Sequence, residues 1–305
     1  MSELKTYALS DLDNWTFEGT ALAVLGHPIK HSVSPQMHNA ALAEMAKRDP
    51  RFATWKYFRF DIAPEDLPVA LGKLHARNFH GINLTVPHKV IAFDFISDVV
   101  LSAQPIGAIN TLMRVKDSWR GYNTDGYGLS NAIKEELLLV LSENIDVLLL
   151  GAGGAARGAA VECLQSGVRS LYIANRTAST RDALIAQIKP LAHKIPVHGL
   201  DPAKLPNDLP ENLLVINATS AGLKPTDSLP IDLTALPRPR AAFDMIYNPP
   251  ETPLLTQARA LGIPAANGLG MLVHQGARAL EIWSEAAVPV DVMRTAVHSA
   301  MKAPA

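Results

Sequence analysis

The chain has 305 residues, enough for about two domains with a hydrophobic core in each. Hydrophobic residues make up 48% of the sequence and charged residues 19%, as in ordinary globular proteins. The formal net charge is -1, so electrostatics gives no reason to expect a nucleic acid, an anionic membrane surface or another polyanion as partner. We therefore look for the function in local motifs.

The sequence gives three indications of the cellular compartment. The single cysteine, Cys163, excludes an internal disulfide framework and is typical of a reducing environment. It lies in a predicted helix among small and apolar residues, so we expect a packed thiol rather than a reactive one. The N-terminal stretch lacks the pattern of a secretory signal, and no apolar run approaches the roughly 20 residues of a membrane span. We expect a cytoplasmic protein.

In the first part of the chain, short apolar runs alternate with amphipathic stretches, which indicates βαβ units and a parallel sheet. A helix is predicted to begin near Ser34 and Pro35, with Ser34 as its N-cap. Two further helices are predicted, Glu65–Asn78 and Lys89–Ile96. The predicted strands are Ala21–Leu25, Lys56–Phe60, Gly81–Thr85, Ala108–Arg114 and Ser118–Tyr122.

A second series of elements begins after a boundary near Asp125. Its predicted strands are Asp146–Leu150, Ser170–Ala174, Leu213–Asn217 and Ala241–Ile246. The first of these is a continuous aliphatic run, as expected of a strand that is buried on both faces. A helix over Ala155–Ser166 is predicted to end with Gly167 as its C′ residue. Residues 192–212 are predicted to form a loop with one short element, and residues 270–286 a helix.

A glycine-rich turn lies between the aliphatic strand and the helix that follows it. Its residues, Gly151, Ala152, Gly153, Gly154 and Ala155, fit a Gly-x-Gly-x-x-Ala pattern when read on to Ala156. Such glycines let backbone N–H groups approach a pyrophosphate, and the helix N-terminus favours negative charge. The turn therefore predicts a dinucleotide site, and a simple tight turn is the alternative.

The end of the next strand bears on the choice of dinucleotide. An NAD site usually has an acidic residue there for the ribose 2′-hydroxyl. This chain instead has Asn175, Arg176 and Thr177, a set suited to a 2′-phosphate, and Arg181 offers a second cation. We therefore predict NADP as the cofactor, with a solvated strand-end charge as the alternative reading of Arg176.

Polar side chains gather at strand ends in the first part of the chain. Ser32 and Ser34 lie in the loop after the first predicted strand, where hydroxyls can bind a carboxylate or a polyol. Asn83 and Thr85 alternate along a strand and so share one face. Lys89 follows at a helix start, where a cation opposes the helix dipole; this placement suggests a function, although surface lysines are common there. Further amides, hydroxyls and a carboxylate follow in residues 107–111 and 121–126.

These segments together resemble the shikimate dehydrogenase family. The resemblance runs from about Ala21 to Trp283 and rests on nine motifs in the family's order. They are His31–Pro35, Asn83–Lys89, Gly107–Thr111, Asn123–Gly126, Gly151–Ala155, Asn175–Thr177, Asn217–Ser220, Asp244–Tyr247 and Gly270–Gln275.

The resemblance implies roles for individual residues. The substrate carboxylate would be bound by Ser32, Ser34 and Tyr247, and the ring hydroxyls by Asn83, Thr85, Asn110 and Gln275. Lys89 and Asp125 would flank the reacting hydroxyl as catalytic residues. The glycine turn would hold the pyrophosphate and Asn175–Thr177 the 2′-phosphate. Met245, Gly268 and Met271 would line the nicotinamide side.

The resemblance also implies the architecture and the reaction. The fold would be α/β, with a substrate-binding domain of residues 1–125 and about 268–305, a Rossmann-type NADP-binding domain of residues 126–267, and a cleft between them. The reaction would interconvert shikimate and 3-dehydroshikimate by hydride transfer, in aromatic amino-acid (chorismate) biosynthesis. In this reaction Lys89 would exchange the hydroxyl proton and Asp125 would orient it. No metal is expected, and a homodimer stays open.

Some features depart from the family pattern or leave alternatives. The family often has an arginine four residues after the arginine of the Asn-Arg-Thr motif. Here that position is Thr180 and Arg181 comes one residue later, which leaves NAD use open. Relatives that favour quinate often carry threonine at the position of Ser34, so serine argues for shikimate. A quinate/shikimate dehydrogenase of dual specificity and a non-catalytic metabolite sensor remain alternatives. About twenty extra residues before Ala21 and a longer stretch over Met45–Thr54 have no functional interpretation from the sequence.

Overall fold

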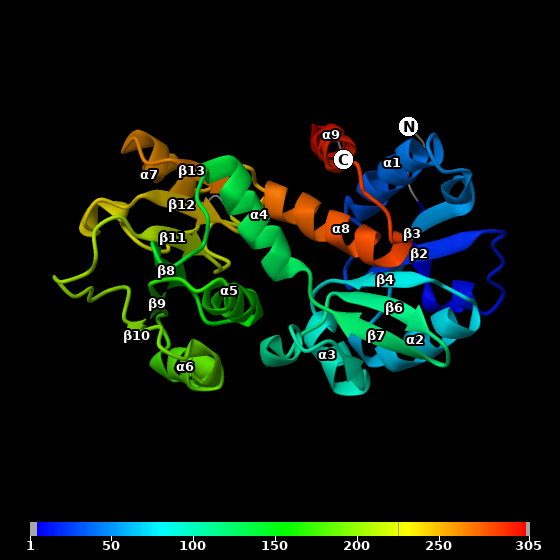
Figure 1. Ribbon diagram of the computed structural model, residues 1–305, viewed down its shortest axis with the longest axis horizontal. Helices are drawn as coiled ribbons and strands as arrows, with labels where there is room; N and C mark the ends of the chain where they lie inside the picture. Colours follow the sequence, from blue (N-terminus) through cyan, green and yellow to red (C-terminus); the bar gives the residue numbers. More distant parts are fainter. Residues whose placement is uncertain (1–4, 225, 303–305) are drawn as a thin grey trace. The chain divides into compact units, whose positions relative to one another are not determined.

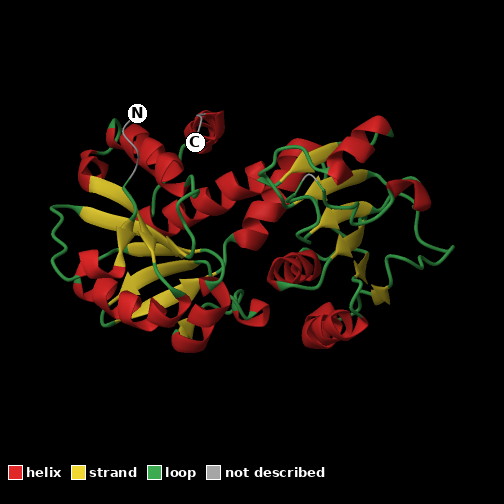
Figure 2. Cartoon of the chain, turned by 180° about the vertical axis from the view of Figure 1, so that it is seen from behind, coloured by secondary structure: helices red, strands yellow, loops and turns green. Residues whose placement is uncertain are grey.

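The computed structural model describes residues 5–224 and 226–302, and the chain divides into two compact units. One unit runs up to Thr124 and resumes at Gln275, and the other comprises Asp125–His274. Figure 1 labels the elements along the chain, and Figure 2 shows helices and strands from behind. Each unit has its own β-sheet, as expected of an α/β protein built from two series of elements.

Within the described part of the first unit, seven strands form one sheet in the order β1-β3-β2-β4-β6-β7-β5. Their bounds are β1 (Tyr7–Ala8), β2 (Thr20–Gly26), β3 (Trp55–Asp61), β4 (Gly81–Leu84), β5 (Asp98–Val99), β6 (Thr111–Val115) and β7 (Ser118–Tyr122). The helices are α1 (Ser34–Ala46), α2 (Leu67–Ala76), α3 (His88–Phe95) and α9 (Val290–Lys302). Helix α8 (Leu269–Ser284) begins in the second unit and ends in the first.

The sheet of the first unit corrects two expectations. It is mixed rather than parallel, because β6 pairs antiparallel with both β4 and β7. Only Lys116 and Asp117 separate β6 from β7, and a connection that short joins antiparallel strands. The first strand is not the predicted one at Ala21, because β1 precedes it and pairs with the outer side of β3.

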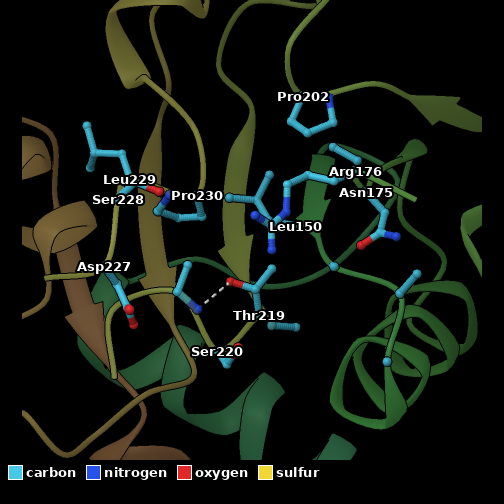
Figure 3. A pocket seen from close by; sticks show the side chains of 16 residues that line it. Leu150, Asn175, Arg176, Pro202, Thr219, Ser220, Asp227, Ser228, Leu229 and Pro230 are labelled. Carbon is cyan, nitrogen blue, oxygen red and sulfur yellow. Dashed lines mark hydrogen bonds between the residues drawn. The ribbon is translucent and has the colours of Figure 1, made fainter. Parts of the chain in front are cut away.

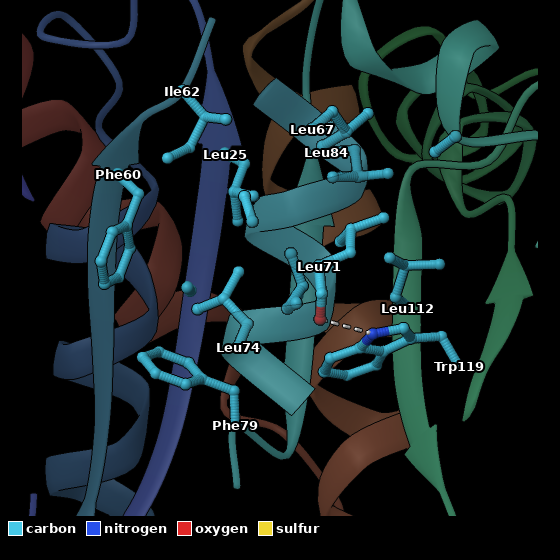
Figure 4. Packing of buried hydrophobic residues seen from close by; sticks show 14 of the residues in the cluster. Leu25, Phe60, Ile62, Leu67, Leu71, Leu74, Phe79, Leu84, Leu112 and Trp119 are labelled. Atoms are coloured by element: carbon cyan, nitrogen blue, oxygen red, sulfur yellow. Dashed lines mark hydrogen bonds between the residues drawn. The ribbon is translucent and has the colours of Figure 1, made fainter. Parts of the chain in front are cut away.

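One hydrophobic core of the first unit lies between the sheet and α2. Figure 4 shows Leu67, Leu71 and Leu74 of this helix facing the strands that carry Leu25 and Leu84. The three leucines recur every three or four residues, so they share one face of the helix. This face fixes α2 on the sheet, and the carboxyl ends of β2 and β4 are thereby held in place.

In the described part of the second unit, six parallel strands form a sheet in the order β10-β9-β8-β11-β12-β13. The bounds are β8 (Asp146–Leu150), β9 (Ser170–Ala174), β10 (Val197–Leu200), β11 (Leu214–Asn217), β12 (Ala241–Asp244) and β13 (Ala265–Asn267). The helices are α4 (Asp125–Leu137), α5 (Gly154–Gln165), α6 (Ala178–Ala192) and α7 (Pro253–Ala260). This is the strand order of Rossmann folds. Strands β9 and β10 are added on one side of β8, and β11, β12 and β13 on the other, so the strand order reverses between β8 and β11.

The local predictions in this unit are largely confirmed. All five residues of β8 are buried. Val147–Leu150 are aliphatic, as expected of a strand covered on both faces, and the buried Asp146 accepts from Ser170 Oγ at 2.6 Å. Gly167 follows α5 with a φ of 73°, and the N–H groups of Gly167 and Val168 donate to Leu164 and Cys163 carbonyls, which closes the helix. Strand β10 is the short element of the predicted loop. Cys163 is buried, and burial raises the pKa of its thiol, so it is a packed side chain.

No helix in residues 5–224 and 226–302 is both long and apolar enough to cross a membrane.

Candidate active site

The first set of predicted site residues lies at one edge of the sheet in the first unit. Strands β2, β3 and β4 are parallel, so their carboxyl ends lie at the same edge. Gly26 ends β2, and a Cβ there would overlap Thr85 Cγ2 and lie 2.8 Å from Ile29 Cδ1. Glycine at this position therefore leaves room for the side chains of both Thr85 and Ile29, the latter from the loop that carries Ser32.

The serine loop differs in one respect from the prediction. Ser34 is the first residue of α1 rather than its N-cap, and the cap residue, Val33, makes no side-chain hydrogen bond. The backbone of Val33 is nearly helical, and its carbonyl already accepts from the N–H of Met37, so the helix begins one residue earlier than a Ser34 cap would allow. The N–H of Ser34 instead donates to Ser32 Oγ at 3.4 Å, which places both serines in one short turn.

A buried network of side-chain amides and hydroxyls continues this edge of the sheet. Asn110, which is 1% exposed, donates from Nδ2 to Thr124 Oγ1 at 2.9 Å and to Gln275 Oε1 at 3.3 Å. Its Oδ1 accepts from the Thr124 N–H at 2.8 Å and from Thr111 Oγ1 at 3.0 Å. Both ends of the Asn110 amide are engaged, so its orientation is fixed.

Asn83 joins the same network from β4. Its Nδ2 donates to the Asn110 carbonyl at 3.1 Å and to Thr111 Oγ1 at 3.0 Å, and its Oδ1 accepts from the Tyr57 hydroxyl at 2.8 Å. An amide carries two donor hydrogens and an oxygen with two lone pairs. Both hydrogens of Asn83 are therefore used, and what this side chain offers a ligand is an acceptor.

The predicted catalytic residues lie at two helix N-termini. Lys89 is the second residue of α3 and is half-buried, and its backbone carbonyl accepts from the Ile109 N–H at 2.9 Å. The start of α3 is thereby joined to the segment that carries Asn110. Asp125 is the first residue of α4 and follows Thr124 directly in the chain. A carboxylate in the first turn suits the helix dipole, whereas the ammonium of Lys89 opposes it.

Two residues that support this network were not predicted from the sequence. Tyr57, on β3, is 1% exposed, and burial raises the pKa of its phenol, so it keeps its proton and donates to Asn83. The His38 ring, from α1, stacks on the Tyr57 ring with centroids 4.1 Å apart. Because neither residue lies in a motif that suggests chemistry, only the fold reveals their place.

Burial of His38 predicts an acid-sensitive fold. The ring is fully buried, and burial lowers its pKa to about 3, whereas an unfolded histidine titrates near 6.5. The stabilisation from this group is complete above pH 6.5 and is lost as the pH falls toward 3, because only the unfolded chain binds the proton. At pH 4.5 the loss is about 2–3 kcal/mol in the free energy of unfolding.

In the His38→Phe variant, the free energy of unfolding should no longer include this loss at low pH, because phenylalanine does not titrate. The variant keeps an aromatic ring against Tyr57. Urea titrations at pH 7.5 and 4.5 measure the difference between the two pH values for each protein. The exposed His298 supplies a control, and His298→Phe should behave like the wild type. Equal acid sensitivity of the wild type and His38→Phe would contradict the assignment of this effect to His38.

The second set of predicted site residues lines a cavity of about 440 Å³ at the carboxyl ends of the strands in the second unit. Figure 3 shows Asn175 and Arg176 on one side of it, and Asp227, Ser228 and Leu229 on the other. The remaining lining residues are Leu150, Gly151, Ala152, Gly153, Ala174, Pro202, Ala218, Thr219, Ser220, Ala221 and Pro230. The cavity lies where the strand order reverses, the usual ligand position in such sheets.

The glycine turn has the shape that a dinucleotide requires. Gly151 has a φ of 108°, and a Cβ there would lie 3.1 Å from the Ala218 carbonyl oxygen. Around Gly153 and Gly154, by contrast, a Cβ would meet nothing within 4 Å, so their backbone faces open space at the start of α5. A turn with an exposed backbone at a helix N-terminus fits a pyrophosphate.

The residues after β9 divide into two groups. Arg176 is exposed and lines the cavity beside Asn175, whose Nδ2 donates to the Thr177 carbonyl at 2.9 Å. The Arg181 side chain is 16% exposed and is not among the lining residues. Its Nε donates to Asp182 Oδ1 at 2.8 Å. The same nitrogen lies 2.7 Å from the position that a Cβ on Gly199 would take. The structure thus brings Arg176 to the cavity and places Arg181 against β10.

One wall of the cavity is fixed by a buried carboxylate, Asp244, which the sequence did not mark as a site residue. Its Oδ1 accepts from Asn217 Nδ2 and from the Ile246 N–H, each at 3.0 Å, and its Oδ2 accepts from Thr252 Oγ1 at 2.7 Å. Asn217 in turn accepts from the Thr219 hydroxyl at 2.7 Å. Burial raises the pKa of Asp244, and the hydrogen bonds act in the opposite direction.

The remaining predicted residues follow β12 and begin α8. A Cβ on Gly268 would overlap the Met245 carbonyl, so glycine permits close contact between these two segments. The Gly268 N–H donates to the Ile246 carbonyl at 3.1 Å. Met271 lies in the first turn of α8 and is half-buried. Tyr247 is also half-buried, and burial raises the pKa of its phenol.

Comparison with sequence families and curated proteins identifies the chain's relatives. Residues 24–112 match the shikimate dehydrogenase substrate binding domain, and residues 268–298 match the shikimate 5'-dehydrogenase C-terminal domain. The shikimate dehydrogenase (NADP(+)) of Symbiobacterium thermophilum is 39% identical over 290 residues, which cover 93% of this chain and 95% of the relative.

Solved structures with the same fold include enzymes of more than one specificity. A shikimate dehydrogenase from Thermus thermophilus, in complex with NADP(H) and shikimate, matches 92% of this chain and 99% of its own, with 33% identity and a TM-score of 0.79. The 5-ketofructose reductase of a Gluconobacter strain matches 93% and 99%, with 29% identity and a TM-score of 0.81. The identity and coverage of these relatives show that the chain belongs to the shikimate dehydrogenase family of oxidoreductases.

Proposed function

We propose that this protein is an NADP-dependent shikimate dehydrogenase, which interconverts shikimate and 3-dehydroshikimate. The observation that carries the proposal is the network of Asn83, Asn110 and Gln275, held in one unit with the serine loop. Shikimate is a ring with one carboxylate and several hydroxyls. Its binding site must supply hydrogen-bond donors for the carboxylate and oriented polar groups for the ring hydroxyls. This edge of the sheet offers both.

The proposed substrate contacts follow from the hydrogen bonds within the network. The hydroxyls of Ser32 and Ser34 lie in one short turn and donate to the substrate carboxylate. Asn83 has both donor hydrogens engaged, so it accepts from a ring hydroxyl. Thr85 and Gln275 are proposed to bind the remaining hydroxyls. Asn110, whose amide hydrogens and oxygen are engaged within the network, is proposed to hold Gln275 in place beside the ring. A site whose amides are already oriented discriminates between substrates by the positions of their hydroxyls.

Lys89 is proposed as the proton-transfer group. A bound nicotinamide cofactor supplies or accepts the hydride. In the reductive direction Lys89 Nζ donates a proton to the ketone oxygen, and in the oxidative direction it takes the hydroxyl proton back. Asp125, next to Thr124, accepts a hydrogen bond from the same substrate oxygen when that oxygen carries its proton. The carbonyl of Lys89 is joined to the segment of Asn110, so the lysine and the ring-binding amides keep a fixed relation.

The preference for NADP rests on the residues at the end of β9. Arg176 lines the cavity and presents a guanidinium where NAD enzymes usually have a carboxylate. The carboxylate that does line the cavity, Asp227, accepts from the N–H groups of Gly222 and Lys224, each at 3.0 Å. Figure 3 shows Asp227 across the cavity from Asn175 and Arg176, away from the strand end where NAD enzymes usually have their carboxylate.

The decisive experiment is a matrix of initial rates with purified protein. Shikimate, quinate and fructose are each offered with NADP+ and with NAD+, 5-ketofructose is offered with NADPH, and the cofactor absorbance is followed. We expect fast turnover with shikimate and NADP+ and slow turnover elsewhere. Comparable rates with quinate or NAD+ would indicate a dual-specificity enzyme, and a preference for 5-ketofructose would indicate a sugar reductase. No turnover by a folded protein that binds NADPH would favour a sensor and overturn the proposal.

A further inference from the structure

The buried arginine of β3, Arg59, has no counterpart in the motifs that define the site. Along β3, Phe58 and Phe60 belong to the hydrophobic core cluster of this unit, so Tyr57 and Arg59 point to the opposite face. Arg59 is 5% exposed, which is unusual for a charged side chain unless its donors are engaged. Its contacts therefore indicate what the charge does.

Arg59 connects two segments that are distant in sequence. Its Nη1 donates to the carbonyl oxygens of Lys30 and Ser32, the latter at 3.2 Å. Its Nε donates to Thr6 Oγ1 at 2.8 Å. Thr6 directly precedes β1, which pairs with β3 through Tyr7 and Phe60. The guanidinium thus lies between the N-terminal strand and the loop that carries the serines.

We propose that Arg59 is a positioning residue for the substrate carboxylate, and that the N-terminal extension, through Thr6, completes its support. By holding the carbonyls of Lys30 and Ser32, it fixes the backbone from which the hydroxyls of Ser32 and Ser34 project. A planar guanidinium with donors in fixed directions can bind both carbonyls and the threonine at once, which an ammonium cannot. Its charge, buried beside the loop, also favours an anionic ligand.

This inference rests on the proposed function, because it assigns the serine loop to a carboxylate. It also gives the extra N-terminal residues a function. Strand β1 covers the edge of β3, and Tyr7 contacts Trp15 with ring centroids 5.0 Å apart, so the extension is anchored by its own packing. An anchored Thr6 holds the guanidinium in one orientation, at low cost in entropy.

Steady-state kinetics of three variants test the proposal. Arg59→Met removes every donor, Arg59→Lys keeps the charge without the planar fork, and Thr6→Val removes one acceptor. We expect Arg59→Met to raise the KM for shikimate by about 10- to 100-fold, and Thr6→Val by about 2- to 10-fold, as loss of charged and of single hydrogen bonds implies. Arg59→Lys should fall between the wild type and Arg59→Met and nearer to Arg59→Met, because it keeps the charge but loses the planar fork. The KM for NADP+ should stay within about twofold in all three, because the cavity of the second unit is untouched.

The control is Lys56→Met, which removes an exposed cation from the same strand. Its KM for shikimate should equal that of the wild type. Shikimate methyl ester adds a chemical test: Arg59→Met should lose much of its defect with this neutral substrate. An unchanged KM for shikimate in folded Arg59→Met, or an equal loss with acid and ester, would overturn the proposal.

Hydrogen exchange separates this proposal from the proposed function. The Ser32 N–H donates to the Ile29 carbonyl at 2.9 Å, so its protection reports the order of the loop without any substrate. We expect faster exchange in peptides that cover residues 27–36 in Arg59→Met and Thr6→Val, and wild-type exchange in Lys56→Met. If the wild type does not act on shikimate but the loop loses protection, the proposed function fails and the positioning role stands. Unchanged protection in both variants sinks the positioning role.

Discussion

Replacement of Lys89 by alanine is expected to lower kcat by about 100- to 10,000-fold, the range for loss of a proton-transfer group. The KM for shikimate should change by less than about fivefold, because the ring is held by the amide network and the carboxylate by the serine loop. Lys89 is half-buried at the start of α3, and its backbone is bonded to Ile109. The alanine variant keeps that backbone bond, so the geometry of the network should persist. Initial rates with shikimate and NADP+ measure both constants.

The matched control for this prediction is Lys73→Ala. Lys73 lies on α2 in the same unit and pairs with Asp13 near the surface, where an ion pair contributes little to stability. Its kcat should equal that of the wild type. A large rise in KM for Lys89→Ala at nearly constant kcat would show that Lys89 binds the substrate and does not transfer its proton. In that case a group other than Lys89 would have to transfer the proton.

Much of the fold could be predicted because its signals are local. The aliphatic run of β8, the glycine turn after it and Gly167 after α5 each specify their structure within a few residues. The mixed sheet of the first unit contradicts the parallel sheet that the alternation of elements predicts. The three residues between the predicted strands Ala108–Arg114 and Ser118–Tyr122 are too few for a parallel crossover, so connection length is the better signal here. Strand β1 was missed because two residues are too few to show a period.

The candidate site was predictable where its residues end strands, and unpredictable where a buried polar group acts across the sequence. Asn83, Asn110 and Arg176 stand next to glycines, prolines or strand ends, where polar residues are conspicuous. From the sequence, Arg59 is expected to be an exposed charge on a strand of alternating apolar and polar residues. Its partners Thr6 and Ser32 are 53 and 27 positions away. Asp244 and Asn217 are 27 positions apart, and only strand pairing in the sheet makes them neighbours.

The cofactor preference should depend on Arg176 and hardly on Arg181. Both are cations after β9, and the sequence suggests both as partners of a 2′-phosphate. In the structure Arg176 is exposed and lines the cavity, whereas Arg181 pairs with Asp182 and lies over Gly199. Arg176→Ala is expected to raise the KM for NADP+ by about 10- to 100-fold, the size of one or two charge-assisted hydrogen bonds, with little change for NAD+.

Arg181→Ala is the comparison that makes this prediction sharp. It removes an equal charge five residues further along, so a general effect of net charge on a polyanionic cofactor would appear equally in both variants. We expect its KM for NADP+ to stay within about threefold of the wild type, and its melting temperature to fall instead, because the guanidinium covers Gly199 in β10. Direct titration with NADPH gives the binding constants without turnover. Equal loss of NADPH affinity in the two variants would show that the 2′-phosphate is bound by the combined charge after β9; loss in Arg181→Ala alone would move the phosphate site to α6.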